Sequence, residues 1–158
     1  MTFRRDAVEI GVISDTHGLV RPEALAALSG VERILHAGDV GRPDVLVALR
    51  AIAPVIAVHG NVDGPPLTER LPAVRVVEIG PARLLLLHDL AQISGDPVAE
   101  GYSAVISGHS HRPAMARKDG VLYLNPGSAG PRRFGRPASL ARLGVEPTGQ
   151  LAARLIEL

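Results

Sequence analysis

Short runs of Val, Ile and Leu recur along this 158-residue chain, and several end in a polar turn that contains glycine. The first run, 8–13, leads directly into Ser14-Asp15-Thr16-His17-Gly18. Apolar runs of this length, alternating with helical patterns, are typical of the strands of an α/β fold. The chain length suits one core, so we expect residues 1–158 to form a single domain.

The first half of the chain alternates strands with helices. We expect strands at 8–13, 33–35 and 55–58 and helices at 22–28 and 43–50. The second half is richer in strands, which we place at 74–79, 83–87, 104–106, 121–124, 139–143 and 151–156. One short helix is predicted at 97–101, and the Pro- and Gly-rich segments 64–66 and 127–137 are predicted to be loops.

Composition excludes several classes of function. The net charge is +1 with acids and bases interspersed, so no nucleic-acid-binding surface is predicted. Aromatic residues make up 3% of the chain, too few for platforms that stack bases. The chain has no cysteine, which rules out disulfides and thiolate metal ligands. No apolar stretch has the length of a membrane span and no signal peptide is evident, so we expect a cytoplasmic protein without a membrane partner.

Side chains that can bind metal ions follow five of the predicted strands. They are Asp15, His17, Asp39, Asn61, His88, His109 and His111. In open α/β sheets, ligands collect outside the carboxyl ends of the strands. Taken alone, each motif is more often a capped turn, a hairpin or a structural histidine than a metal ligand. Their ordered succession after successive strands favours one common site, and the glycines beside them permit tight turns.

Seven donors exceed what one tetrahedral ion accepts and suit two adjacent divalent ions. One carboxylate would then bridge two ions about 3.5–4 Å apart. Imidazole and carboxylate ligands without sulfur favour Mn, Fe, Zn, Ni or Co over calcium or a purely magnesium site, and we take manganese as the first candidate.

The same residues, in order, resemble the motif series of the calcineurin-like metallophosphoesterase superfamily. The matching motifs are Asp15-Thr16-His17, Gly38-Asp39, Gly60-Asn61-Val62-Asp63, His88 and Gly108-His109-Ser110-His111. Asn125-Pro126-Gly127-Ser128 and the short length resemble the small bacterial and archaeal YfcE-like phosphodiesterase branch. The resemblance implies two packed, mostly mixed sheets flanked by helices, a four-layer α/β/β/α sandwich with the metals at one edge.

The resemblance also implies a division of the ligands between two ions. Asp15, His17 and His111 would hold one ion. Asn61, His88 and His109 would hold the other, and Asp39 would bridge them. Catalytic parts would fall to Asp39, Asn61 and His109.

The activity implied by the resemblance is hydrolysis of a small phosphorylated substrate by a metal-dependent phosphodiesterase. Two cations neutralise charge on phosphate oxygens and ionise a water for in-line attack. Three hydroxyls, of Ser14, Ser110 and Ser128, are expected to support turns or ligands rather than to act as nucleophiles. A phosphomonoesterase, a nucleotide pyrophosphohydrolase and a non-catalytic metal-binding scaffold are the alternatives, and a homo-oligomer is left open.

Two positions depart from the family pattern. Larger relatives carry a histidine directly after Gly-Asn, where it protonates the leaving group, whereas this chain has Val62 followed by Asp63. We expect Asp63 to orient neighbouring groups rather than to donate a proton. Asp89 follows His88 where relatives often have glycine.

Five further residues have two readings. Arg132, Arg133 and Arg136 lie in the 127–137 loop, where a guanidinium could bind substrate phosphate or face solvent. His36 and His59 precede ligand-bearing turns and are expected to be structural, with a phosphate contact as the alternative.

Overall fold

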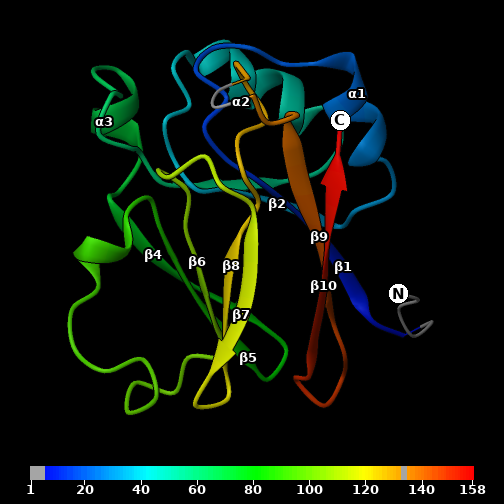
Figure 1. The fold of residues 1–158 in the computed structure, drawn as a ribbon, viewed down its shortest axis with the longest axis vertical. Helices are drawn as coiled ribbons and strands as arrows, with labels where there is room; N and C mark the ends of the chain where they lie inside the picture. Colours follow the sequence, from blue (N-terminus) through cyan, green and yellow to red (C-terminus); the bar gives the residue numbers. More distant parts are fainter. Residues whose placement is uncertain (1–5, 133–134) are drawn as a thin grey trace.

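A computed structural model describes residues 6–132 and 135–158, which form two five-stranded sheets packed face to face (Figure 1). Sheet A has the order β10 (Leu151–Glu157), β9 (Ser139–Val145), β1 (Val8–Ile13), β2 (Arg33–His36) and β3 (Val55–Ala57). Sheet B has the order β4 (Val74–Ile79), β5 (Ala82–Leu87), β6 (Ala104–Ile106), β8 (Val121–Asn125) and β7 (Ala114–Lys118). The predicted α/β fold with two packed mixed sheets is confirmed.

Parallel strands form the centre of sheet B and one side of sheet A. β1, β2 and β3 are parallel to one another, as are β5, β6 and β8. β9 pairs antiparallel with β1, while β4 and β7 pair antiparallel with β5 and β8. The carboxyl ends of six parallel strands, three in each sheet, are thus available to carry site residues.

The two outer faces are covered differently. Helices α1 (Pro22–Ala27) and α2 (Pro43–Arg50) pack on sheet A, where Leu28 and Leu49 join one apolar cluster with Ile34. On sheet B the outer cluster is completed by Ile93 and Tyr102, which belong to the loop after the 3₁₀ turn η1 (Leu90–Gln92). A further one-turn helix, α3 (Leu67–Arg70), follows β3. In the described residues no helix has both the length and the apolar character needed to cross a membrane.

The main core lies between the sheets and follows from the period-two alternation of the strands. In β5, Leu84 and Leu86 point into the inter-sheet cluster, whereas Leu85 and Leu87 join the outer cluster of sheet B. All four side chains are buried, which accounts for the continuous apolar run in the sequence. Burial of a leucine side chain is worth about 1.5–3 kcal/mol, so this strand anchors both layers.

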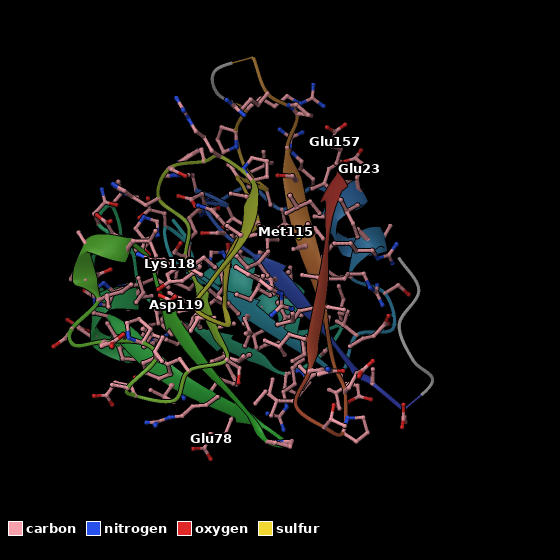
Figure 2. The ribbon with its side chains drawn as sticks, turned by 60° about the horizontal axis from the view of Figure 1, so that its bottom comes forward. Glu23, Glu78, Met115, Lys118, Asp119 and Glu157 are labelled. Carbon is pink, nitrogen blue, oxygen red and sulfur yellow. The ribbon has the colours of Figure 1, made fainter. Side chains whose placement is uncertain are left out.

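Three of the shorter elements differ from prediction. The helix predicted at 97–101 is wrong, because this segment forms consecutive turns, to which the proline and glycine at its ends are also suited. The sequence analysis did not predict α3, η1 or β7. Every residue of β7 is exposed, so it lacks the apolar alternation that marks a strand. Figure 2 labels Met115 and Lys118 of this strand and Asp119 in the turn after it.

The remaining predictions hold within a few residues. β1, β4, β6 and α2 have the predicted bounds, while β9 and β10 extend beyond them. The loops at 64–66 and 127–137 are confirmed for their described positions; residues 133 and 134 lie outside the described part of the chain.

Candidate metal centre

All seven predicted donors follow parallel strands. From sheet A, Asp15 and His17 follow β1, Asp39 follows β2 and Asn61 follows β3. From sheet B, His88 follows β5, and His109 and His111 follow β6. The carboxyl ends of these strands meet at one edge of the sandwich, so side chains far apart in the sequence become neighbours.

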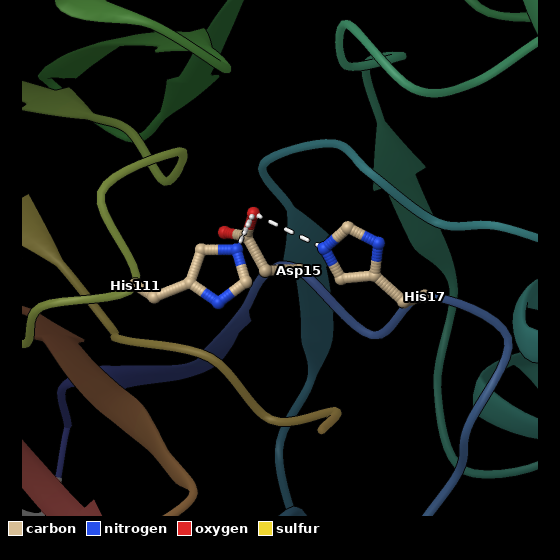
Figure 3. A group of neighbouring side chains, drawn as sticks. All are labelled: Asp15, His17 and His111. Atoms are coloured by element: carbon tan, nitrogen blue, oxygen red, sulfur yellow. Dashed lines mark ion pairs between the residues drawn. The ribbon is translucent and has the colours of Figure 1, made fainter. Parts of the chain in front are cut away.

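Asp15 lies at the middle of the buried part of this group. Its Oδ1 atom is 3.2 Å from His111 Nε2 and 3.8 Å from His17 Nε2, as Figure 3 shows. The same oxygen is 3.9 Å from His88 Nε2. One carboxylate oxygen therefore faces three imidazole nitrogens, contributed by both sheets.

Asp39 provides the second carboxylate. Its Oδ2 atom is 3.2 Å from His88 Nε2 and 3.7 Å from His17 Nε2. The donor atoms form two groups, and within each group all atoms lie within 4.8 Å of one another. The groups are Asp15–His17–His111 and Asp15–Asp39–His88. These five residues are brought together as the sequence predicted.

Asn61 and His109 form an exposed rim beside the buried donors. His109 Nδ1 lies 3.2 Å from Asn61 Oδ1, and the His109 ring meets His88 edge-on at 5.1 Å. The side chain of His109 is 46% exposed, against 2% for His88. The division of ligands between two ions stays a prediction, but every predicted donor lies in or against the same cluster.

The buried donors have the properties that a cation site requires. Asp15 Oδ1 and His17 Nε2 are buried and make no hydrogen bond to any described residue. The other oxygen of Asp15 accepts hydrogen bonds from Ser14 Oγ and the His109 N–H, so Oδ1 is left for another partner. Buried polar atoms without partners cost about 1–3 kcal/mol each. A divalent cation would satisfy these atoms, and the set of imidazole and carboxylate donors fits one.

The partners of Asp39 and His88 orient these two residues in the same way. Asp39 Oδ1 accepts a hydrogen bond from the Val62 N–H, which leaves Oδ2 facing the histidines. His88 Nδ1–H donates to the Ala37 carbonyl at 2.8 Å, so the Nε2 lone pair points inward. Each side chain thus has one atom held by the backbone and one directed at the centre.

The charges of these two groups are coupled. Burial alone would raise the pKa of Asp39, but the contact with His88 and the Val62 N–H outweigh it and lower the pKa. Burial alone would lower the pKa of His88, but Asp39 and the charge of Asp15 outweigh it and raise the pKa. Each of these two groups therefore favours the charged form of the other, and a bound cation would take over this stabilisation of the carboxylates.

The backbone at the donors is strained. Five of the predicted donors have positive φ angles although none is glycine: Asp15 (54°), His17 (46°), Asp39 (54°), His109 (71°) and His111 (61°). Such conformations cost about 1–3 kcal/mol each and cluster at functional sites. Among the described non-glycine residues the other example is Asp119, in the hairpin turn between β7 and β8.

Asp63 connects two ligand-bearing turns. Its carboxylate accepts hydrogen bonds from the N–H groups of Val40 (3.1 Å), Gly41 (2.8 Å) and Gly60 (2.9 Å). The predicted orienting role is confirmed. Because both oxygens act as acceptors, Asp63 is poorly suited to donate a proton to a leaving group.

His36 connects the first two ligand-bearing turns. Its Nδ1 accepts a hydrogen bond from the Gly38 N–H, so its Nε2–H donates to Thr16 Oγ1, whose own hydroxyl donates to the Val40 carbonyl. His36 is completely buried, and this burial lowers its pKa to about 4. The expectation that His36 is structural is confirmed. The Thr16 contact was not predicted, since nothing in the sequence indicates which turn a buried histidine reaches.

Residues 125–128 support the turns that carry the donors after β6 and β1. The amide of Asn125 donates to the Gly108 carbonyl and to Ser110 Oγ, and the Ser128 hydroxyl donates to the Asp15 carbonyl. Together with Ser14, these hydroxyls hold turns and ligands, as predicted. The role of Asn125 was not predicted, because its motif matched the family pattern without indicating a partner.

The remaining candidates that the structure describes line two pockets. Arg132 and Arg136 line a pocket of about 470 Å³ with Gly135 and Pro137, whereas Arg133 lies outside the described residues. Their contact with a substrate stays a prediction. His59 lines a pocket of about 240 Å³ next to the centre, together with Gly60, Asn61, His88, Asp89 and Gln92.

Comparison with known proteins agrees with this geometry. Residues 8–148 match the model of the calcineurin-like phosphoesterase superfamily domain. A probable metallophosphoesterase of Methanothermobacter thermautotrophicus is 41% identical over 131 residues, which cover 75% of this chain and 76% of the relative. A probable metallophosphoesterase of Methanocaldococcus jannaschii is 35% identical over 94% of this chain and 81% of its own length. The chain therefore belongs to the calcineurin-like phosphoesterase superfamily.

Solved structures share the fold at lower identity. A novel archaeal phosphodiesterase has a TM-score of 0.72 at 23% identity, over 94% of this chain and 99% of its own. The Escherichia coli phosphoesterase YfcE has a TM-score of 0.67 at 22% identity, over 94% and 98%. Vacuolar protein sorting 29 from Cryptosporidium parvum has a TM-score of 0.77 at 20% identity, over 99% of each chain. The predicted family resemblance is confirmed.

Proposed function

We propose that this chain is a phosphodiesterase that binds two divalent ions at the edge where the two sheets meet. One observation carries the proposal: Asp15 Oδ1 is buried, makes no hydrogen bond to a described residue and faces the Nε2 atoms of His17, His88 and His111. A carboxylate oxygen and imidazole nitrogens in this arrangement fit a transition-metal ion. Manganese is the first candidate, with iron, zinc, nickel and cobalt as the others.

Each predicted ligand has a part in this proposal. Asp15, His17 and His111 would hold one ion, and Asn61, His88 and His109 the other. Asp39 would touch both ions, because its Oδ2 lies near His17 of the first set and near His88 of the second. When bound, the two ions supply positive charge to phosphate oxygens and make a nucleophilic water available near neutral pH.

The residues that follow Asn61 restrict the substrate. Val62 has no proton to donate, and Asp63 is occupied by three backbone N–H groups. Leaving groups that need no proton, such as aryl oxides, would therefore be favoured over alkoxides. The fold that the chain shares with an archaeal phosphodiesterase directs the proposal to diesters.

The test is hydrolysis by purified protein of bis-p-nitrophenyl phosphate, p-nitrophenyl phosphate and a nucleoside diphosphate ester, with manganese and then with chelator. The proposal expects the fastest turnover for the diester, lost when chelator is added. A preference for the monoester or the diphosphate would indicate one of the alternative enzymes. Bound metal without turnover of any of the three would indicate a scaffold.

A further inference from the structure

The carboxylate of Asp89 lies beside His109 on the exposed side of the candidate centre. Its Oδ2 is 3.6 Å from His109 Nε2, while the other ring nitrogen, Nδ1, is 3.2 Å from Asn61 Oδ1. One nitrogen of His109 thus faces a predicted ligand and the other faces a carboxylate. Histidine ligands of metals commonly donate their second ring N–H to a carboxylate or carbonyl, which sets the tautomer and the ring orientation.

A local hydrogen-bond pattern holds the Asp89 carboxylate in place. Asp89 Oδ1 accepts a hydrogen bond from the Ala91 N–H, and the Asp89 N–H donates to Gln92 Oε1, each at 3.0 Å. These bonds form a capping box at the start of η1. One oxygen is therefore occupied by the cap, and the other is left to face His109.

His109 has more need of such support than His88. A backbone carbonyl, that of Ala37, accepts the Nδ1–H of the buried His88. His109 is 46% exposed and has a φ of 71°, so neither close packing nor a relaxed backbone restrains its ring. Asp89, a side chain on the neighbouring loop, stands in the place that the carbonyl takes for His88.

We propose that Asp89 is a positioning residue, which holds His109 with Nε2–H toward the carboxylate and the Nδ1 lone pair toward the second metal ion. The inference rests on the proposed function, because it requires His109 to bind metal. Asp89 directly follows the predicted ligand His88, so its place in the chain holds it next to the centre. The negative charge of Asp89 would also make the His109 imidazole a stronger metal ligand.

Three variants separate this role from the cap. Asp89→Ser keeps a capping oxygen but is too short to reach His109, whereas Asp89→Asn keeps an acceptor at full length without the charge. Asp96→Ser is the matched control, because Asp96 lies in the same loop and accepts a hydrogen bond from the Val98 N–H. Each metal-stripped protein is titrated with manganese and followed by calorimetry and electron paramagnetic resonance.

We expect Asp89→Ser to weaken binding of the second ion about 10- to 100-fold while the first ion binds as in wild type. Asp89→Asn should lose less, and Asp96→Ser should bind both ions normally. Wild-type affinity for both ions in Asp89→Ser would overturn the proposal.

A spectroscopic readout distinguishes orientation from general loosening of the loop. In zinc-loaded, ¹⁵N-histidine-labelled protein, the His109 Nε2–H should exchange slowly with solvent in wild type and Asp89→Asn, and faster in Asp89→Ser. Equal exchange in all three would contradict the proposed orientation.

A wild-type protein that binds two ions but hydrolyses no phosphate ester would refute the proposed function and leave the Asp89 comparison valid. A wild-type protein that binds fewer than two ions would overturn the role of Asp89 itself.

Discussion

The two halves of the candidate centre are held in different ways. The half around Asp15 is buried, and its carboxylate is completely shielded from solvent, whereas His109 in the other half is 46% exposed. Backbone groups and buried hydroxyls orient the first half, but a loop carboxylate faces the second. In the proposed two-ion centre, the fold would therefore form most of one ion's surroundings before any metal binds, and the affinity of the second ion would depend more on the exposed side chains of Asn61 and His109.

Substitution of Asp39 should have the largest effect, because its Oδ2 faces both halves. We expect Asp39→Asn to lose at least one bound ion and to lower hydrolysis at least about 1000-fold, beyond the effect of a single lost electrostatic contact. Metal analysis of the purified variant and its rate on an aryl diester check this. Asp44→Asn, in an exposed pair with Arg42, is the control. Retention of both ions and wild-type turnover in Asp39→Asn would exclude the shared position.

His36 should make the buried half sensitive to acid. Its pKa is about 4 in the folded protein and 6.5 ordinarily, so the unfolded chain binds a proton that the folded chain excludes. The stabilisation is complete above pH 6.5 and is lost as the pH falls through about 4, a difference of about 3 kcal/mol. Urea unfolding of metal-free wild type and His36→Gln across this range measures the contribution. The same pH dependence in both proteins would show that His36 does not carry it.

Close packing around Asp39 should make Gly60 intolerant of a side chain. A Cβ atom at Gly60 would collide with the Asp39 carboxylate, whereas one at Gly64 would meet no atom within 4 Å. We expect Gly60→Ala to lower the free energy of unfolding by about 1–3 kcal/mol and to impair metal binding, and Gly64→Ala to do neither. Thermal denaturation of the two variants provides the comparison. Equal stability of both would mean that the turn relaxes around the added methyl group.

The smallest effect is expected at the exposed rim. Val62 is 56% exposed and follows Asn61, where a histidine could protonate a leaving group. Val62→His should raise turnover of an alkyl diester about tenfold, part of what a well-placed general acid contributes, and leave an aryl diester unchanged. Rates on the two diesters measure the difference. Equal gains on both substrates would point to an effect other than proton donation.

Much of the fold and the positions of the donors could be predicted from local pattern. The apolar run 84–87 and the proline that opens α2 identify their elements without tertiary information. β7 could not be found in this way, because its five exposed residues gain their strand conformation from pairing with β8. The helix predicted at 97–101 failed because proline and glycine at its ends also suit consecutive turns.

The contacts that hold the donors in place could not be predicted from the sequence. The donors were recognisable because each follows a strand, a relation that is local in the chain. The partners of Asp63, Thr16 and Asn125 lie in other turns, so they depend on how the strand ends come together. Gly60 and Gly108 are also explained only by the fold, since each lies against a carboxylate, Asp39 or Asp15, and neither has a positive φ.

Anomalous diffraction from crystals grown with excess manganese tests the central claim most directly. Two peaks are expected, one contacting Asp15, His17 and His111 and the other contacting Asn61, His88 and His109, with Asp39 in contact with both. A single peak, or manganese bound away from these histidines, would contradict a centre that two ions share.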